Sequence, residues 1–169
     1  MQPSRILSCL AVVLSITWCE SLNAEDAVAT QQQHVTSERL QDAVCPVHPD
    51  QRARRENATN YKDAWLYFSS PEAMQSFDAG KEKQEAFANY QLVLTKQYRQ
   101  QNCPLSGEEP DEDFGTMMVG KVQLLVLCED CAKEIGKLPL EEQVTTVFDA
   151  QGFELAKFTR GKLDEEPKP

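Results

Sequence analysis

Histidine is scarce in this chain, which holds only His34 and His48 among its 169 residues. A Ser/His/Asp catalytic set needs a histidine between a nucleophile and an acidic residue, and no such set can be assembled here. The sequence also lacks a glycine-rich phosphate-binding loop and any carboxylate pair that stands apart from its acidic loops. These absences predict that the protein is not an enzyme.

Basic residues are too few for a nucleic-acid-binding surface. The chain has 17 Lys and Arg against 27 Asp and Glu, and its formal net charge is −10. Proteins that bind nucleic acid place a basic surface against the phosphates, so this class of partner is excluded. The acidic balance is compatible with a solvated extracytoplasmic protein that attracts cations.

Long apolar runs are also missing, and the one apolar stretch at the start indicates a signal peptide. Residues 1–5 are a short basic start, residues 6–18 are mostly apolar, and the small residue Ala24 ends the segment. This layout is typical of secretory signal peptides, and the apolar run is too short for a membrane span. We predict a signal peptide over residues 1–24, export to the periplasm or the extracellular space, and no membrane span in the mature chain.

The cysteines leave more than one chemistry open. Two of the six lie in the predicted signal peptide, and the mature chain keeps four: Cys45, Cys103, Cys128 and Cys131. Export permits disulfides, and four thiols allow three different pairings.

The mature chain divides into a lead-in, two similar units and a tail. We predict a flexible lead-in over residues 25–42, a first unit over residues 43–101, a second unit over residues 102–160 and a charged tail over residues 161–169. The predicted fold class is α+β: two small tandem β-hairpin–helix units joined by a longer helix over residues 81–100, behind a cleaved signal peptide.

Local signals predict where several elements begin. Ser69-Ser70-Pro71-Glu72 is typical of a helix start, because serine caps the first N–H groups and proline fits the first helical position. Apolar residues at intervals of three or four from Phe87 to Tyr98 predict that the longer helix buries one face. Residues 116–119 and 122–127 predict a hairpin around Gly120-Lys121.

An internal repeat relates the two units. We call the difference in residue number between Cys45 and Cys103 the repeat offset. Applied without a gap, this offset carries residues of the first unit onto the second: Cys45 onto Cys103, Phe68 onto Val126, Ser70 onto Cys128 and Ala73 onto Cys131. The apolar framework therefore predicts the same shape twice, whereas the paired thiols occur only in the second unit.

The second unit resembles the YHS/TRASH-type domain, a small treble-clef-like module of heavy-metal sensing and transport proteins. The resemblance is carried by Cys103-Pro-Leu-Ser-Gly, a strand, and Cys128-Glu-Asp-Cys131 at the start of a helix. Two such units in tandem behind a signal peptide are similar to a group of exported proteins seen in planctomycete bacteria. The resemblance covers residues 45–158 and implies that Cys103, Cys128 and Cys131 are metal ligands.

The sequence departs from the family pattern at two places. Leu127 stands where the family has a further cysteine, and the first unit has Ser70 and Ala73 in place of the paired thiols. The resemblance therefore supports metal ligands in the second unit only.

A helix start is a favourable place for metal-binding thiols. The positive end of the helix dipole and the free N–H groups stabilise thiolates there. Three thiolates supply three of the four ligands of a tetrahedral zinc site, and Cu(I) is coordinated by two or three thiolates. The predicted cofactor is therefore a zinc or copper ion, and the candidates for a further ligand are Cys45, His48, Glu129, Asp130 and water.

The same cysteines are compatible with two functions that need no metal. Disulfides between Cys128 and Cys131 and between Cys45 and Cys103 would make the chain a disulfide-stabilised scaffold or interaction module. A Cys-x-x-Cys motif in an exported chain is also compatible with thiol–disulfide exchange. The sequence does not indicate a particular protein partner.

Overall fold

The computed structural model describes residues 34–109, 115–127 and 129–161. The predicted signal peptide, most of the lead-in, Cys128 and all of the tail except its first residue, Gly161, lie outside the described residues.

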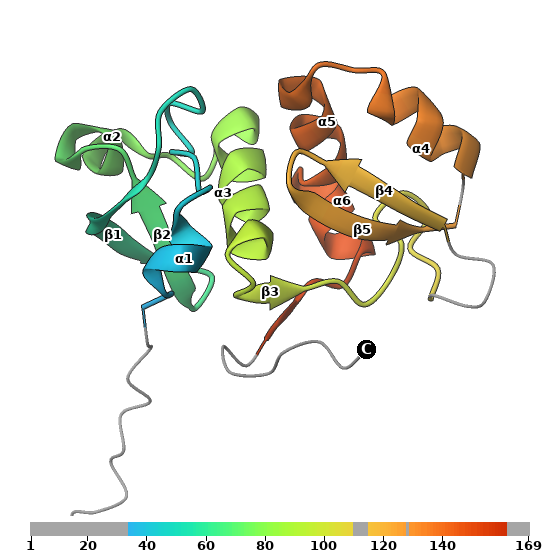
Figure 1. Cartoon of the computed structure of the whole chain (residues 1–169), viewed down its shortest axis with the longest axis horizontal. Helices are drawn as coiled ribbons and strands as arrows, with labels where there is room; N and C mark the ends of the chain where they lie inside the picture. Colours follow the sequence, from blue (N-terminus) through green and yellow to red (C-terminus); the bar gives the residue numbers. More distant parts are fainter. Residues whose placement is uncertain (1–33, 110–114, 128, 162–169) are drawn as a thin grey trace, which may run out of the picture. The chain divides into compact units, whose positions relative to one another are not determined.

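The described residues form a mixed α+β fold of six helices and three two-stranded antiparallel sheets (Figure 1). In chain order the elements are α1 (Ser37–Leu40), β1 (Arg54–Tyr61), β2 (Ala64–Phe68), α2 (Pro71–Ser76), α3 (Glu82–Leu94), β3 (Tyr98–Arg99), β4 (Gly115–Val119), β5 (Val122–Val126), α4 (Glu129–Gly136), α5 (Leu140–Val147), α6 (Ala150–Leu155) and β6 (Thr159–Arg160). The sheets are β1–β2, β4–β5 and β3–β6. Among the described residues, no helix is long and apolar enough to cross a membrane.

The repeat offset also relates the observed elements. It carries β2 onto β5 with the same bounds, and it carries the first residues of α2 and α3 onto the first residues of α4 and α5. The first unit is thus a hairpin followed by α2 and α3, and the second is a hairpin followed by α4, α5 and α6. Helix α3 packs against β2 on one side and against α5 and α6 on the other (Figure 1).

The predicted start of the first short helix is confirmed. The Ser70 hydroxyl accepts a hydrogen bond from the Ala73 amide at 3.2 Å, and Pro71 occupies the first helical position. The Ser70 side chain and the backbone amide of Glu72 hold the pKa of the Glu72 carboxyl below its usual value. A capped and negatively charged first turn is what stabilises so short a helix.

The predicted helix over residues 81–100 is wrong at its C-terminal end, because α3 stops at Leu94. Thr95 ends the helix and its hydroxyl donates to the Gln91 carbonyl at 2.7 Å, while Lys96 adopts a left-handed φ of 59°. Tyr98 therefore lies on β3, which pairs with β6. The apolar spacing continued past Leu94, but a partner strand from the far end of the described chain determines the local structure.

Residues 34–42 of the predicted lead-in pack against the first hairpin. Thr36 caps α1, and Val35, Leu40 and Ala43 are buried against Tyr67. His34 stacks on Trp65 with ring centroids 4.0 Å apart. Three apolar side chains in a polar segment suffice to anchor it to the first hairpin.

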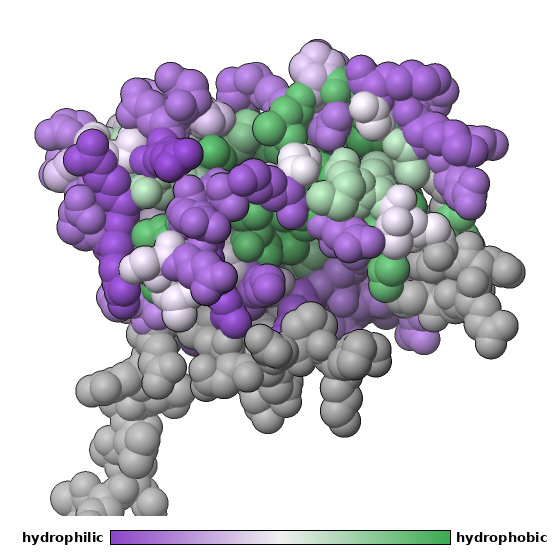
Figure 2. All heavy atoms as spheres, in the orientation of Figure 1, coloured by the Kyte–Doolittle hydropathy of each residue, from purple (hydrophilic) through white to green (hydrophobic). Residues whose placement is uncertain are grey.

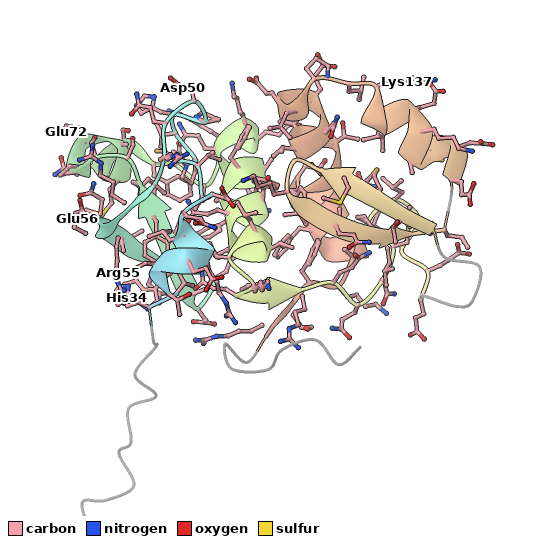
Figure 3. All side chains as sticks on the ribbon, in the orientation of Figure 1. His34, Asp50, Arg55, Glu56, Glu72 and Lys137 are labelled. Atoms are coloured by element: carbon pink, nitrogen blue, oxygen red, sulfur yellow. The ribbon has the colours of Figure 1, made fainter. Side chains whose placement is uncertain are left out.

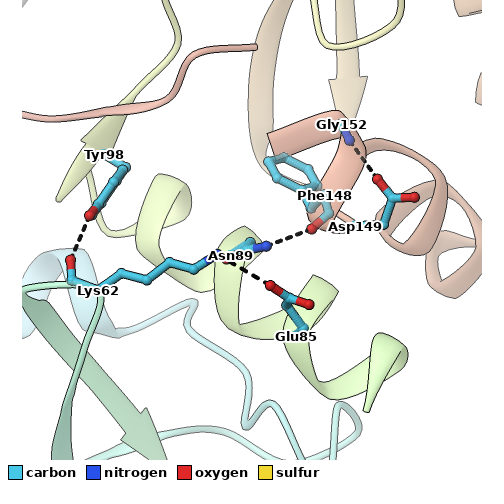
Figure 4. A network of polar contacts seen from close by, with 7 residues as sticks. All are labelled: Lys62, Glu85, Asn89, Tyr98, Phe148, Asp149 and Gly152. Atoms are coloured by element: carbon cyan, nitrogen blue, oxygen red, sulfur yellow. Dashed lines mark hydrogen bonds and ion pairs between the residues drawn. The ribbon is translucent and has the colours of Figure 1, made fainter. Parts of the chain in front are cut away.

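A polar network ties the two units together around Lys62 (Figure 4). Lys62 lies in the turn of the first hairpin, and its Nζ donates to Asn89 Oδ1 at 2.9 Å and to Glu85 Oε1 at 3.3 Å on α3. The same ammonium lies 4.5 Å from the ring centroid of Phe153 in the second unit. The buried Asn89 in turn donates to the Phe148 carbonyl at 2.9 Å.

Candidate metal centre

The residues after Cys103 form a tight turn that faces inward. The Gly107 amide donates to the Cys103 carbonyl and the Cys103 amide donates to the Glu108 carbonyl, both at 2.8 Å. Gly107 adopts a φ of 77°, a region that favours glycine. Asn102 closes the turn, because its side-chain amide donates to the Gly107 carbonyl at 2.7 Å.

The turn surrounds the Cys103 sulfur with hydrogen-bond donors. Cys103 is fully buried and is a free cysteine. Burial raises the pKa of its thiol, but the backbone amides of Leu127, Leu105 and Ser106, together with the Ser106 hydroxyl, outweigh burial and leave the pKa below its usual value. Donors directed at sulfur favour the thiolate, which is the form that binds metal ions.

One of these donors comes from the far end of the second hairpin. Leu127 follows β5 directly, and it immediately precedes Cys128 in the sequence. The Cys103 sulfur therefore lies beside the residue that leads into the Cys-x-x-Cys motif, and α4 begins at Glu129. Cys128 itself lies outside the described residues.

The third predicted ligand is in a different chemical state. Cys131 lies on an exposed part of α4 and is disulfide-bonded. Its partner is outside the described residues, because Cys45 and Cys103 are both free. The alternative bridge between Cys45 and Cys103 is therefore absent, and the two described members of the predicted ligand set are one buried thiol and one exposed disulfide sulfur.

The candidates for a further ligand do not converge on Cys103. Cys45 is buried in a separate cluster with Leu66, Phe68 and Ala73. His48 is exposed, and the Asp130 side chain is 96% exposed and lies 3.5 Å from Lys133. Across residues 34–109, 115–127 and 129–161, no three His, Cys, Asp or Glu side chains form a group that could hold a metal ion.

The charged side chains labelled in Figure 3 point away from the fold rather than toward a common centre. Those labelled in Figure 3, from Asp50 and Glu56 in the first unit to Lys137 in the second, project from the ribbon into solvent. Helix α4 itself has no fully buried residue and leaves a cleft of about 310 Å³ against β4. The described side chains therefore offer no hard-cation site made of carboxylates.

In the first unit the amide of the matching cysteine also bonds a carbonyl of the following loop, but the paired thiols are absent. The Cys45 amide donates to the Gln51 carbonyl at 2.9 Å, as Cys103 does to Glu108. At the positions that match the paired thiols, Ser70 caps α2 and Ala73 is buried. Ser70 therefore stabilises the start of α2, and Ala73 packs in the core.

No protein-family model, curated protein or solved structure matches this chain. The resemblance to YHS/TRASH-type domains therefore rests on the residues and their spacing.

Sequence reasoning missed one set of polar residues, the glutamines that bond the edges of the hairpins. Gln91 and Gln97 are buried, and the amides of Gln91, Gln97 and Gln100 each donate to and accept from one strand residue. A glutamine inside an apolar stripe, as Gln91 is in α3, is the signal that could have revealed them.

Proposed function

We propose that the second unit binds a soft or borderline transition metal, zinc or copper, through Cys103, Cys128 and Cys131 in an exported protein. The proposal rests on the environment of the Cys103 sulfur. Four hydrogen-bond donors, from its own turn and from Leu127, lower the pKa of this buried thiol. A buried thiol in an apolar core without such donors would have a raised pKa and would be inert.

The proposal requires the reduced form of Cys131. A disulfide sulfur is not a thiolate, and thiolate is the ligand form of cysteine. With the disulfide intact, Cys103 is the one described thiolate donor of the set, which is too few for a stable zinc site. Metal binding is therefore expected to follow reduction.

A second function is favoured by the disulfide itself. If Cys131 stays oxidised under the conditions in which the protein works, the chain is a disulfide-stabilised scaffold or interaction module. The exposed position of Cys131 and the separate burial of Cys45 and Cys103 support this reading.

Metal analysis of the mature chain separates the two functions. The protein is purified under reducing, anaerobic conditions, and bound zinc and copper are measured beside a thiol titration. We expect about one metal ion per chain, loss of that ion in Cys103→Ser and Cys131→Ser, and retention in Cys45→Ser, which removes an equally buried thiol from the other unit. Circular dichroism of each variant shows whether it is folded. A reduced, folded wild-type chain without metal supports the scaffold.

A further inference from the structure

A groove of about 550 Å³ runs between α3 and the outer edge of β5. The half-buried Val93 and Leu94 on α3 and the 41% exposed Leu125 on β5 give it an apolar lining. Figure 2 shows this lining as a hydrophobic area bordered by hydrophilic side chains. Leu125 is one of only three large apolar side chains that are exposed within the described residues.

The backbone of β5 points hydrogen-bonding groups into this groove. Gln100 accepts from the Leu125 amide at 2.9 Å and donates to the Leu125 carbonyl at 2.6 Å, so these groups point away from β4. Residues two apart on a strand point the same way, so the N–H and C=O of Gln123 face the same side. Within the part of the chain that the structure describes, nothing bonds to them.

The internal repeat shows that this open position is exceptional. The repeat offset carries Trp65 onto Gln123, and the Gln97 amide bonds both the N–H of Trp65, at 2.8 Å, and its C=O, at 2.7 Å. Gln91 does the same for Tyr67, which matches Leu125. Three of the four equivalent edge positions are thus capped by a glutamine. An uncapped edge is where an extended chain can add as a strand.

The basic residues along the groove favour binding of an acidic segment. Lys96, Arg99 and Lys121 line it, and Lys121 also pairs with Asp42 at 2.6 Å. A basic rim is unusual in a chain with a net charge of −10. An acidic extended segment with an apolar residue would complement both the rim and the lining.

The described chain ends beside this groove. The Gly161 amide donates to the Gln97 carbonyl at 2.9 Å, and a β-carbon on Gly161 would lie 3.1 Å from Arg99 Nε. The following residues are Lys162, Leu163 and then Asp164-Glu165-Glu166. The segment 162–169 in extended form spans up to about 26 Å, whereas a strand of the length of β5 spans about 17 Å.

We propose that residues 162–169 occupy this groove, pair with the backbone of Gln123, and cover the open edge of β5. Leu163 then meets the apolar lining, and the three acidic residues meet Lys96, Arg99 and Lys121. This inference is independent of metal binding. The tail would protect an edge that otherwise invites pairing with another chain.

Amide hydrogen exchange in the full chain tests the proposal. The variant in which Asp164, Glu165 and Glu166 are all changed to Lys keeps every described residue. We expect the Gln123 amide to exchange at least tenfold faster in this variant than in the wild type. The Trp65 amide, which Gln97 bonds within the fold, is the internal control and should not change.

A pair of proline variants on opposite edges of the same hairpin gives a second readout. Gln123→Pro removes the outward N–H of β5, and Met118→Pro removes the outward N–H of β4, because Met118 and Gln123 are paired residues. Proline is tolerated at such edge positions. We expect faster cleavage after Glu165 by a glutamate-specific protease in Gln123→Pro only.

Three outcomes overturn the proposal. Fast exchange of Gln123 in the wild type shows an empty edge. Equal protection in the wild type and the charge-reversed variant points to another occupant, such as a second copy of the chain, which sedimentation would reveal. Equal protease sensitivity of the two proline variants shows that the tail does not depend on this edge.

Discussion

The substitution Ser106→Ala tests the environment of the Cys103 sulfur directly. The Ser106 hydroxyl is one of four donors that lower the pKa of the thiol. A hydrogen bond to a charged group contributes about 1.5–3 kcal/mol, and the lower end applies because Ser106 is exposed. A loss of about 1.5 kcal/mol corresponds to roughly tenfold weaker binding of a metal by the thiolate.

The assay has two parts. The ultraviolet absorbance of thiolate is followed against pH in a Cys45→Ser background with the Cys131 disulfide intact, and zinc affinity is measured on the reduced chain by competition with a chelator. We expect the pKa of Cys103 to rise in Ser106→Ala and zinc affinity to fall about tenfold. Ser76→Ala, which removes an exposed hydroxyl that donates to the Ala73 carbonyl in the first unit, is the matched control. An unchanged pKa and an unchanged affinity in Ser106→Ala would show that the Ser106 hydroxyl does not stabilise the Cys103 thiolate.

The lowered pKa of Cys103 also predicts how stability depends on pH. A thiol whose pKa is lower in the folded than in the unfolded chain stabilises the fold fully above the unfolded value, about 8.5. That contribution is lost as the pH falls through the lower, folded pKa. Chemical denaturation of the reduced chain should therefore show stability rising toward a pH of about 8.5, and Cys103→Ser should remove that rise.

Three further predictions concern the framework. Ser70→Ala removes the cap of α2 and should destabilise the fold by about 1 kcal/mol in urea denaturation, whereas Ser70→Gly should cost only a few tenths; equal costs would contradict the capping role. Asn89→Leu leaves the Phe148 carbonyl unbonded, removes an acceptor of Lys62 and should cost about 1–3 kcal/mol, against a near-neutral Gln101→Leu at an exposed position. Burial raises the pKa of all four tyrosines in the described residues: Tyr61, Tyr67, Tyr90 and Tyr98. The stability that they contribute is present below their usual pKa of about 10 and is lost as the pH rises through the folded values. Tyrosinate absorbance and denaturation at alkaline pH should show this loss, and normal titration of all four would contradict it.

The elements that the sequence predicted well are those with local signals. Ser70, the N-cap of α2, and Pro71, its first residue, determine where this helix begins. Gly120-Lys121 determines the turn of the second hairpin. The repeat offset, read from the aligned cysteines and apolar positions, carries β2 onto β5. For the helix start and the hairpin turn, the residues that decide the structure lie within a few positions of it.

The elements that the sequence missed depend on distant partners. Tyr98 leaves the helical pattern because it pairs with Arg160 on β6. Residues 34–42 are ordered by contacts with Tyr67, which lies on a separate element far along the chain. The glutamine that caps β5 is recognisable only once Gln100 is seen beside Leu125. Periodicity and capping rules carry no information on such long-range contacts.

In the candidate site, too, some features follow from local sequence and others depend on contacts between distant segments. The two segments that carry the resemblance form a turn at Cys103 and helix α4 at Cys131. The amide of Leu127 against the Cys103 sulfur was not predicted, because it joins two segments that the whole second hairpin separates. The oxidised state of Cys131 was one of the alternatives that the sequence left open.

Metal binding through Cys103 is tested most directly by X-ray absorption spectroscopy of the reduced mature chain loaded with one equivalent of zinc. We expect sulfur ligands at about 2.3 Å, with one fewer sulfur in Cys103→Ser and an unchanged spectrum in Cys45→Ser. A zinc ion surrounded only by nitrogen and oxygen, or a spectrum that Cys103→Ser leaves unchanged, would contradict it.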